Sequence, residues 1–295
     1  MQLLKDSIVA LITPFKSNLE VDYEAFTNLV LFHLQSGTNG VVVSGTTGES
    51  AVLTRQEKLS LLEIAIDTAK KHKSNIPIIF NSGNNNTAES IDLSKEARKL
   101  GANWLLLVAP YYNKPNQEGL LMHFKAIASS VDLPICLYNV PGRTASDINV
   151  DTVIQLSQID NILAIKDATP CLVRPLKISL GVKNFSQLSG EDATTLAYLA
   201  SGGNGSISVT ANIVPNLCQE VHELWQNGNF KQALQSHLKL LPLHNAMFIE
   251  SNPVPVKYAL SLMGKCGYYV RQPLAELSEP SKLLIQQTLK NLKLI

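Results

Sequence analysis

Eight short apolar runs recur along this 295-residue chain at fairly even spacing. They are Ile8–Leu11, Gly40–Val43, Pro77–Asn81, Trp104–Val108, Pro134–Tyr138, Ile162–Lys166, Phe185–Ser189 and Gly205–Val209. Successive runs begin roughly 20 to 37 residues apart, which is the period of a strand followed by a helix. Runs such as Leu105–Val108 are apolar at consecutive positions, so both faces of the predicted sheet must be buried. Eight such strands favour the α/β class and a closed (β/α)8 TIM barrel over a doubly wound open sheet.

The segments between the runs show helical periodicity. Asp22 is expected to cap a helix that ends near Gly37, and Thr54 with Glu57 forms the pattern of a capping box. The buried face of the first helix is predicted to contain Phe26, Leu29, Val30 and Leu34.

After Pro215 the pattern changes, and only helical periodicity remains to the end of the chain. We therefore expect a C-terminal helical extension. The predicted domains are a barrel that carries the active site over residues 1–224 and a helical domain over residues 225–295.

The composition argues against several classes of partner. A formal net charge of +1 offers no basic surface for nucleic acid, and no apolar stretch approaches the roughly 18 residues of a membrane span. The first residues lack the pattern of a signal peptide, so we expect a cytoplasmic location. The six histidines and four cysteines show no metal-binding spacing. We expect no metal site, and we expect the cysteines to be buried free thiols.

Lys166 ends the sixth apolar run, where an amine would lie against apolar neighbours. Such surroundings favour the neutral amine, which can attack a ketone and form a Schiff base. The alternative is a strand whose polar end simply reaches solvent, and most single lysines are of that kind. The residues at the ends of neighbouring strands decide between the two interpretations.

Active sites of such barrels lie at the carboxyl ends of the strands. The turn Gly45–Glu49 after the second run exposes backbone N–H groups and two hydroxyls, which suit an anion, although ordinary turns share this composition. Tyr138 ends the fifth run and could transfer protons, or could be a half-buried aromatic. Arg143 could bind a carboxylate, or could be a surface arginine. Together with Lys166, these residues indicate carbonyl chemistry on a keto acid.

Six motifs resemble those of the dihydrodipicolinate synthase family, also called 4-hydroxy-tetrahydrodipicolinate synthases. They are GTTGES at 45–50, APYYNKP at 109–115, LYNVPGRT at 137–144, IKDAT at 165–169, SGED at 189–192 and GSISVTAN at 205–212. The likeness extends into the tail at Pro253–Lys257. It implies a (β/α)8 lyase, usually a homotetramer built as a dimer of dimers. The implied reaction condenses pyruvate with L-aspartate 4-semialdehyde in lysine and diaminopimelate biosynthesis, with no metal or organic cofactor.

The resemblance implies roles for individual residues. Lys166 would form the Schiff base with pyruvate. Tyr138, Thr47 and Tyr112 would form a proton relay, with Tyr112 reaching in from a neighbouring subunit.

The same resemblance implies a set of substrate-binding residues. Thr46, Thr47 and the backbone at Ile207 would hold the pyruvate moiety. Arg143 would bind the carboxylate of the semialdehyde, and Gly190 of the SGED motif completes the set.

Family members that lysine inhibits have an inter-subunit cleft, and this chain resembles them at Ser50, Ala51, Asn85, Glu89 and Tyr111. Those members often have histidines at the positions of Arg55 and Lys58. Two cations beside a cationic ligand should repel it, so we expect weak or absent inhibition by lysine.

Two positions depart from the family pattern. Asp167 stands where many members have glutamate, which preserves the charge. Asn81-Ser82 replaces a glycine-containing turn after the third run, so the geometry of that loop does not follow from the resemblance.

Other functions share part of this site. N-acetylneuraminate lyases and keto-deoxy-sugar-acid aldolases have the same lysine and tyrosine. The Thr46-Thr47 pair and Arg143 favour the synthase, since the lyases tend to have serine first and the sugar-acid enzymes have a different loop. A non-catalytic barrel that binds a keto acid is a further alternative, but a pure binding protein needs no proton relay.

Overall fold

The computed structural model describes residues 3–295, in which eight strands form one closed barrel in the order β1 to β8. The strands are β1 Asp6–Ala10, β2 Val41–Val43, β3 Ile78–Asn81, β4 Trp104–Val108, β5 Ile135–Asn139, β6 Ile162–Asp167, β7 Ser186–Ser189 and β8 Gly205–Ser208. All eight predicted strands are present, and the predicted (β/α)8 fold is confirmed. Pro77 and Pro134 each precede a strand by one residue, because proline has no N–H to donate to the ladder.

The chain divides into two compact units. Among the described residues, the first comprises 3–6 and Pro77–Ile207, and the second comprises Ser7–Ile76 and Ser208–Ile295. The predicted boundary at residue 224 lies within helix α9, Pro215–Gln226, and a separate helical domain from residue 225 stays a prediction.

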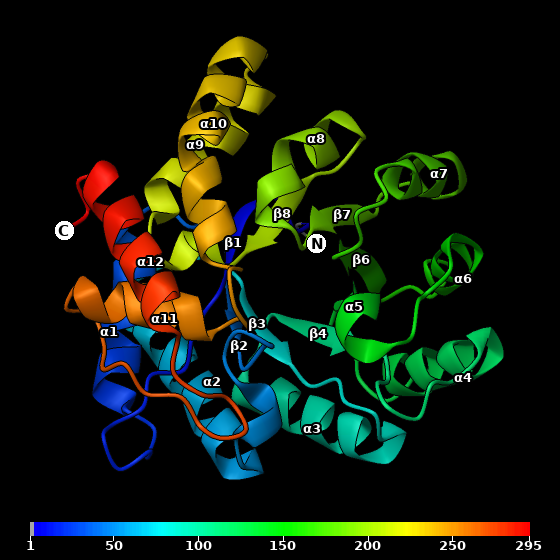
Figure 1. The fold of residues 1–295 in the computed structure, drawn as a ribbon. Coiled ribbons are helices and arrows are strands. Elements are labelled where there is room, and N and C mark those ends of the chain that lie inside the picture. The colour runs from blue at the N-terminus through cyan, green and yellow to red at the C-terminus, as the bar shows by residue number, and fades with distance from the viewer. Residues whose placement is uncertain (1–2) are drawn as a thin grey trace. The chain divides into compact units, whose positions relative to one another are not determined.

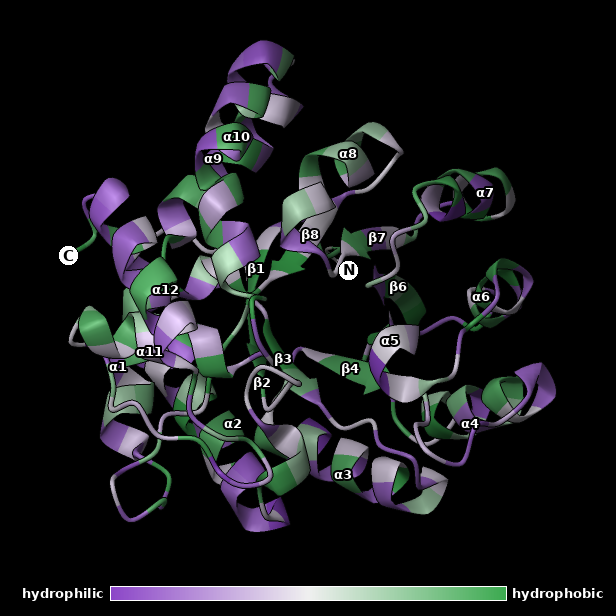
Figure 2. Ribbon diagram, viewed as in Figure 1, coloured by the Kyte–Doolittle hydropathy of each residue, from purple (hydrophilic) through white to green (hydrophobic). Residues whose placement is uncertain are grey.

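In the first unit, strands β3 to β8 pair in parallel with their neighbours. Its helices are α3 Thr87–Leu100, α4 Gln117–Ala128, α5 Pro141–Thr144, α6 Val150–Leu156, α7 Val173–Gly181 and α8 Thr195–Ala200, with a 3₁₀ turn η2 at Asp192–Thr194. Figure 1 shows α3, α4, α6 and α7 on one side of strands β4 to β7. Figure 2 shows that α3 and α4 carry both hydrophobic and hydrophilic residues, whereas β4 is mostly hydrophobic. These helices therefore bury one face of the strands, as the consecutive apolar positions required.

In the second unit, β1 pairs in parallel with β2. Its helices are α1 Tyr23–Gln35, α2 Arg55–Lys71, α9, α10 Phe230–Ala246, α11 Val254–Leu262 and α12 Glu279–Asn291, with 3₁₀ turns η1 at Ser50–Val52 and η3 at Thr210–Asn212. Helices α9 and α10 pack together, as do α11 and α12 (Figure 1). The helical character of the tail is thus confirmed.

The predicted caps of this unit are confirmed. The Asp22 side chain accepts a hydrogen bond at the start of α1, and Thr54 with Glu57 forms a complete capping box on α2. His33, not Leu34, completes the buried face of α1.

No helix within residues 3–295 is long and apolar enough to cross a membrane. The four cysteines are all free. The prediction that they are buried is wrong for Cys171, which is exposed on the loop between β6 and α7, and Cys266 is only partly buried.

Candidate active site

Lys166 and Tyr138 lie side by side at the ends of β6 and β5. The parallel register pairs them directly, and Lys166 is 6% and Tyr138 5% exposed. The lysine Nζ lies 4.3 Å from the centroid of the tyrosine ring. The structure therefore brings together the predicted nucleophile and one member of the predicted proton relay in a site that excludes most water.

Cys136 lies two residues before Tyr138 on β5, opposite Ala164 of β6. Because strand residues two apart share a face, this thiol belongs to the same face of the sheet as the lysine and tyrosine. Burial raises the pKa of Cys136 to about 12, although the nearby Lys166 charge opposes that shift. The thiol is therefore neutral at ordinary pH and forms part of the apolar lining beneath the amine.

Gly190 makes room for the lysine side chain. A Cβ added at this position would lie 2.7 Å from the Ala168 Cβ and 3.1 Å from the Lys166 Cε. The glycine N–H donates to the Asp167 carbonyl at 2.8 Å. Gly190, predicted as a substrate-binding residue, thus lies against the Lys166 stem, and its role toward substrate stays a prediction.

Asp167 follows Lys166 and points to the opposite face of the strand, as alternation requires. Its Oδ2 accepts from Arg174 Nε at 2.7 Å, and its Oδ1 accepts from the Thr169 N–H at 3.0 Å. Arg174 Nη2 also donates to the Ile148 carbonyl at 2.7 Å. The carboxylate that departs from the family pattern is therefore a buried structural partner of α7.

Arg143 lies on the short helix α5, and the loop that follows this helix is held by polar contacts. Asn139 Nδ2 donates to Asp147 Oδ1 at 2.7 Å, and the Ile148 N–H donates to Asn139 Oδ1 at 3.0 Å. Arg174 Nη1 lies 3.4 Å from Asp147 Oδ2. The exposed Arg143 thus lies on a short helix whose following loop is tied to the ends of β5 and β6.

Glu191 is a site residue that the sequence interpretation missed, although it lies in the SGED motif. Burial and the neighbouring Asp192 raise the pKa of its carboxyl, while Lys166 and Arg143 lower it. Lys166 and Arg143 therefore both influence this one carboxyl group. Glu191 is therefore a half-buried acid near both the predicted nucleophile and the predicted carboxylate-binding arginine.

In the second unit, Thr46 and Thr47 lie in the turn after β2. Thr47 is 2% exposed, and its Oγ1 accepts a hydrogen bond from Asn252 Nδ2 at 3.0 Å. The hydroxyl oxygen accepts from the amide, and its own proton remains available to an acceptor. Asn252 was missed in the sequence, although it immediately precedes the Pro253–Lys257 run that resembles the family.

Tyr112 and Ile207 differ greatly in exposure. Tyr112 lies on the loop between β4 and α4, is 89% exposed, and has a φ of 71°. Ile207 lies within β8 and is 1% exposed. The structure does not bring Tyr112 to Lys166, and the predicted contribution to a neighbouring subunit remains a prediction.

The predicted cleft residues fall in both units. In the first unit Tyr111 lies near Glu89 and Asn85. Burial and the Glu89 charge raise the pKa of Tyr111, while a hydrogen bond with the Asn85 backbone lowers it. In the second unit Ser50 and Ala51 belong to η1, and Arg55 and Lys58 to the first turn of α2.

The loop after β3 passes close to the backbone of β4 at Gly83. A Cβ at Gly83 would lie 2.5 Å from the Val108 backbone nitrogen, so only glycine fits there. Ser82 is buried and its Oγ accepts from Ser94 Oγ at 2.8 Å. Gly83 therefore lets the loop after β3 pass close to the backbone of β4.

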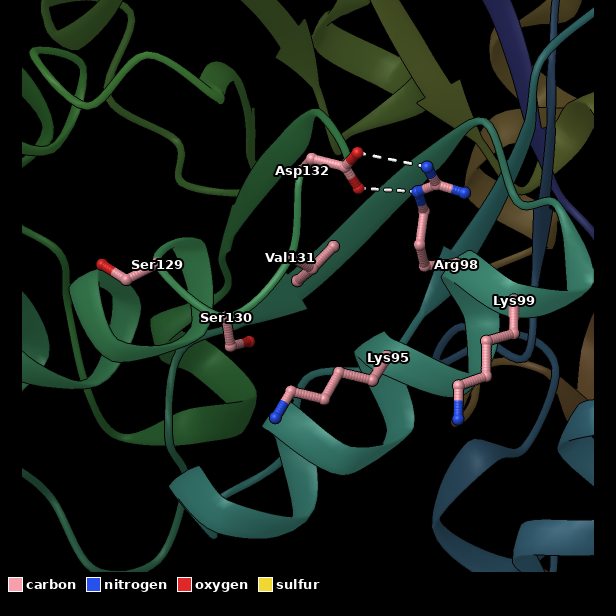
Figure 3. Close-up of a pocket in the computed structure, with 7 residues that line it drawn as sticks. All are labelled: Lys95, Arg98, Lys99, Ser129, Ser130, Val131 and Asp132. Atoms are coloured by element: carbon pink, nitrogen blue, oxygen red, sulfur yellow. Dashed lines mark hydrogen bonds and ion pairs between the residues drawn. The ribbon is translucent and has the colours of Figure 1, made fainter.

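A groove of 580 Å³ lies elsewhere in the first unit, between the end of α3 and the loop after α4. Figure 3 shows Arg98 turned toward Asp132, while the Lys95 and Lys99 amines point away from that pair. The Arg98 Nε lies 2.6 Å from Asp132 Oδ1, and both side chains are largely exposed. Exposed ion pairs of this kind contribute little to stability.

Within residues 3–295, no three potential ligands gather in a metal-binding cluster.

Comparisons with known proteins agree over nearly the whole chain. Residues 3–292 match the model described as the dihydrodipicolinate synthetase family. The chain is 46% identical over 293 residues to a 4-hydroxy-tetrahydrodipicolinate synthase of Bradyrhizobium diazoefficiens, covering 99% of this chain and 97% of the relative. It is similar to the crystal structure of dihydrodipicolinate synthase from Aquifex aeolicus, with a TM-score of 0.96, 43% identity and 99% of each chain covered. The chloride-inhibited synthase of Acinetobacter baumannii, complexed with pyruvate, has a TM-score of 0.95, 43% identity and 99% coverage of each chain.

Proposed function

Because the chain belongs to the dihydrodipicolinate synthetase family, we propose that it condenses pyruvate with L-aspartate 4-semialdehyde through a Schiff base on Lys166. The observation that carries this proposal is the buried Lys166 amine 4.3 Å from the Tyr138 ring centroid. The pyruvate-complexed structure of a similar synthase supports the choice of first substrate.

The reaction begins when the Lys166 amine attacks the keto carbon of pyruvate. Loss of water gives a protonated imine, and loss of a methyl proton gives the enamine. The enamine carbon then attacks the aldehyde carbon of the second substrate and forms the new carbon–carbon bond. The substrate amine displaces the lysine by transimination, closing the ring and releasing free Lys166. The protonated imine is the electron sink, so the reaction needs no metal or organic cofactor.

The remaining residues bind substrate and move protons. Tyr138, Thr47 and Tyr112 transfer protons during imine formation and release. Thr46, Thr47 and the Ile207 backbone hold the pyruvate moiety.

Arg143 binds the carboxylate of the semialdehyde, and its planar guanidinium suits two parallel hydrogen bonds. Gly190 lies at the wall of the pyruvate site.

The assembly we propose is a cytoplasmic homotetramer, a dimer of dimers, acting in lysine and diaminopimelate biosynthesis. Support comes from exposed apolar side chains. Tyr112 is 89% exposed, and α7 presents Val173, Leu176 and Leu180 at 52%, 50% and 90% exposure. Their spacing places the three on one helix face, which suits burial against another subunit.

Imine trapping tests the proposal. The protein is incubated with pyruvate, reduced with borohydride and digested, and the modified peptide is identified by mass spectrometry. We expect one adduct on Lys166 and none in a Lys166→Arg variant. An unmodified Lys166 would refute the mechanism and favour a non-catalytic binding protein.

A second assay separates the synthase from its relatives. We expect turnover of pyruvate with aspartate semialdehyde and none with N-acetylneuraminate or a keto-deoxy-sugar acid. The reverse preference would identify a sugar-acid lyase.

A further inference from the structure

A buried ion pair joins the C-terminal tail to the turn that carries the two threonines. Lys257 of α11 donates through Nζ to Glu49 Oε1, and the two side chains are 0% and 1% exposed. The same Nζ donates to the Tyr269 carbonyl at 2.9 Å and lies 3.9 Å from the Phe15 ring centroid. The backbone N–H of Arg271 donates to Glu49 Oε2 at 3.0 Å. Both carboxylate oxygens are therefore held by the tail.

Burying this pair is expensive, so it needs an explanation other than stability. Moving two charged groups out of water costs free energy that their mutual attraction often fails to recover. An apolar pair of the same size often stabilises a protein more than a buried ion pair does. Burial lowers the pKa of Lys257, and Glu49 opposes that shift. The best-supported role of a buried charged pair is to specify one conformation over its alternatives.

The geometry held here is that of the turn from Gly45 to Glu49. Glu49 has a φ of 55°, which is unfavourable for a residue with a side chain. Its N–H donates to the Thr46 carbonyl at 3.0 Å, and the next N–H, of Ser50, donates to the Gly45 carbonyl at 3.2 Å. Fixing the Glu49 carboxylate therefore fixes the backbone on which Thr46 and Thr47 are placed.

We propose that Glu49 and Lys257 are positioning residues, through which the C-terminal tail sets the Thr46–Thr47 turn for pyruvate binding. This inference rests on the proposed function, since it takes the two threonines as the pyruvate-binding residues. The Glu49–Lys257 pair then acts on pyruvate binding through the turn, and neither member of the pair touches the substrate.

Two variants test the inference by pyruvate-dependent imine trapping, with thermal unfolding measured in parallel. Lys257→Met leaves the Glu49 carboxylate buried without its cation, and the double variant Glu49→Gln, Lys257→Met removes both charges. We expect the half-saturating pyruvate concentration to rise about ten-fold or more in both variants, since small displacements of binding groups have large effects. We expect the thermal midpoint to fall in the single variant and to recover in the double variant. If Lys257→Met does not fold, the double variant still gives the test.

Arg271→Met is the matched control in the same tail. It removes the side-chain bonds to Glu57, at 2.6 and 2.8 Å, but keeps the N–H that donates to Glu49. We expect a lower thermal midpoint with an unchanged half-saturating pyruvate concentration.

The outcomes separate the two proposals. If the unaltered protein forms no adduct, the proposed function is refuted and this inference with it. If the unaltered protein forms the adduct but the double variant has the same half-saturating concentration, or Arg271→Met raises it equally, the inference alone is refuted.

Discussion

Substitution of Gly190 by alanine should displace the Lys166 amine with little loss of fold. The added Cβ would lie 2.7 Å from the Ala168 Cβ, whereas carbon atoms in contact lie about 3.5–4.0 Å apart. Ala168 has no flexible side chain to move aside, and its N–H donates to the Asn139 carbonyl at 2.9 Å. The segment after Gly190 and the Lys166 stem must therefore give way by about 1 Å in total.

Two magnitudes follow from that displacement. Overpacking of this size costs about 1–3 kcal/mol of unfolding free energy. A shift of about 1 Å in a reacting group lowers the rate about 100-fold. The rate of imine formation should therefore fall far more than the stability does.

The assay compares single-turnover imine trapping with urea unfolding for Gly190→Ala and for Gly142→Ala. Gly142 is the matched control, because an added Cβ there meets nothing within 4 Å. We expect a rate near that of the unaltered protein for the control. A Gly190→Ala rate within about three-fold of the unaltered protein would refute the packing argument, since about 1 Å of displacement predicts a loss near 100-fold.

Three further predictions concern charge. Because the Glu191 pKa is raised, the folded protein favours the protonated carboxyl. The stability that this group contributes is complete below the ordinary carboxyl pKa, and it is lost as pH rises through the raised pKa. Glu191→Gln should thus raise the thermal midpoint at about pH 8 and leave it unchanged at about pH 4; an equal effect at both would contradict this. Arg174→Leu should cost about 3–5 kcal/mol in urea unfolding by leaving Asp167 buried and unpaired, and adding Asp167→Asn should recover much of it. Lysine should inhibit the condensation weakly or not at all, given the charges of Arg55 and Lys58, and inhibition in the millimolar range would show this to be wrong.

The positions of Lys166 and Tyr138 at strand ends could be predicted from the sequence, because strand ends are local features. Lys166 and Tyr138 were each identified as the last residue of an apolar run, and the register pairs them directly. The rule that barrel sites lie at carboxyl ends of strands then selected them together. The sequence could not predict that Cys171 is exposed or that His33 is buried in place of Leu34. Both depend on which surface each loop and helix covers.

The number of strands, their parallel order and the chemistry at their ends follow from hydrophobic periodicity and residue type, which are properties of short segments. The supporting contacts do not follow from any segment. Lys257 meets Glu49 across 208 residues of sequence, and Asn252 meets Thr47 across 205. Whether a lysine is a solvated surface group or half of a buried ion pair depends on neighbours that only tertiary packing supplies. The difference in free energy between those two environments is set by desolvation and by the partner charge.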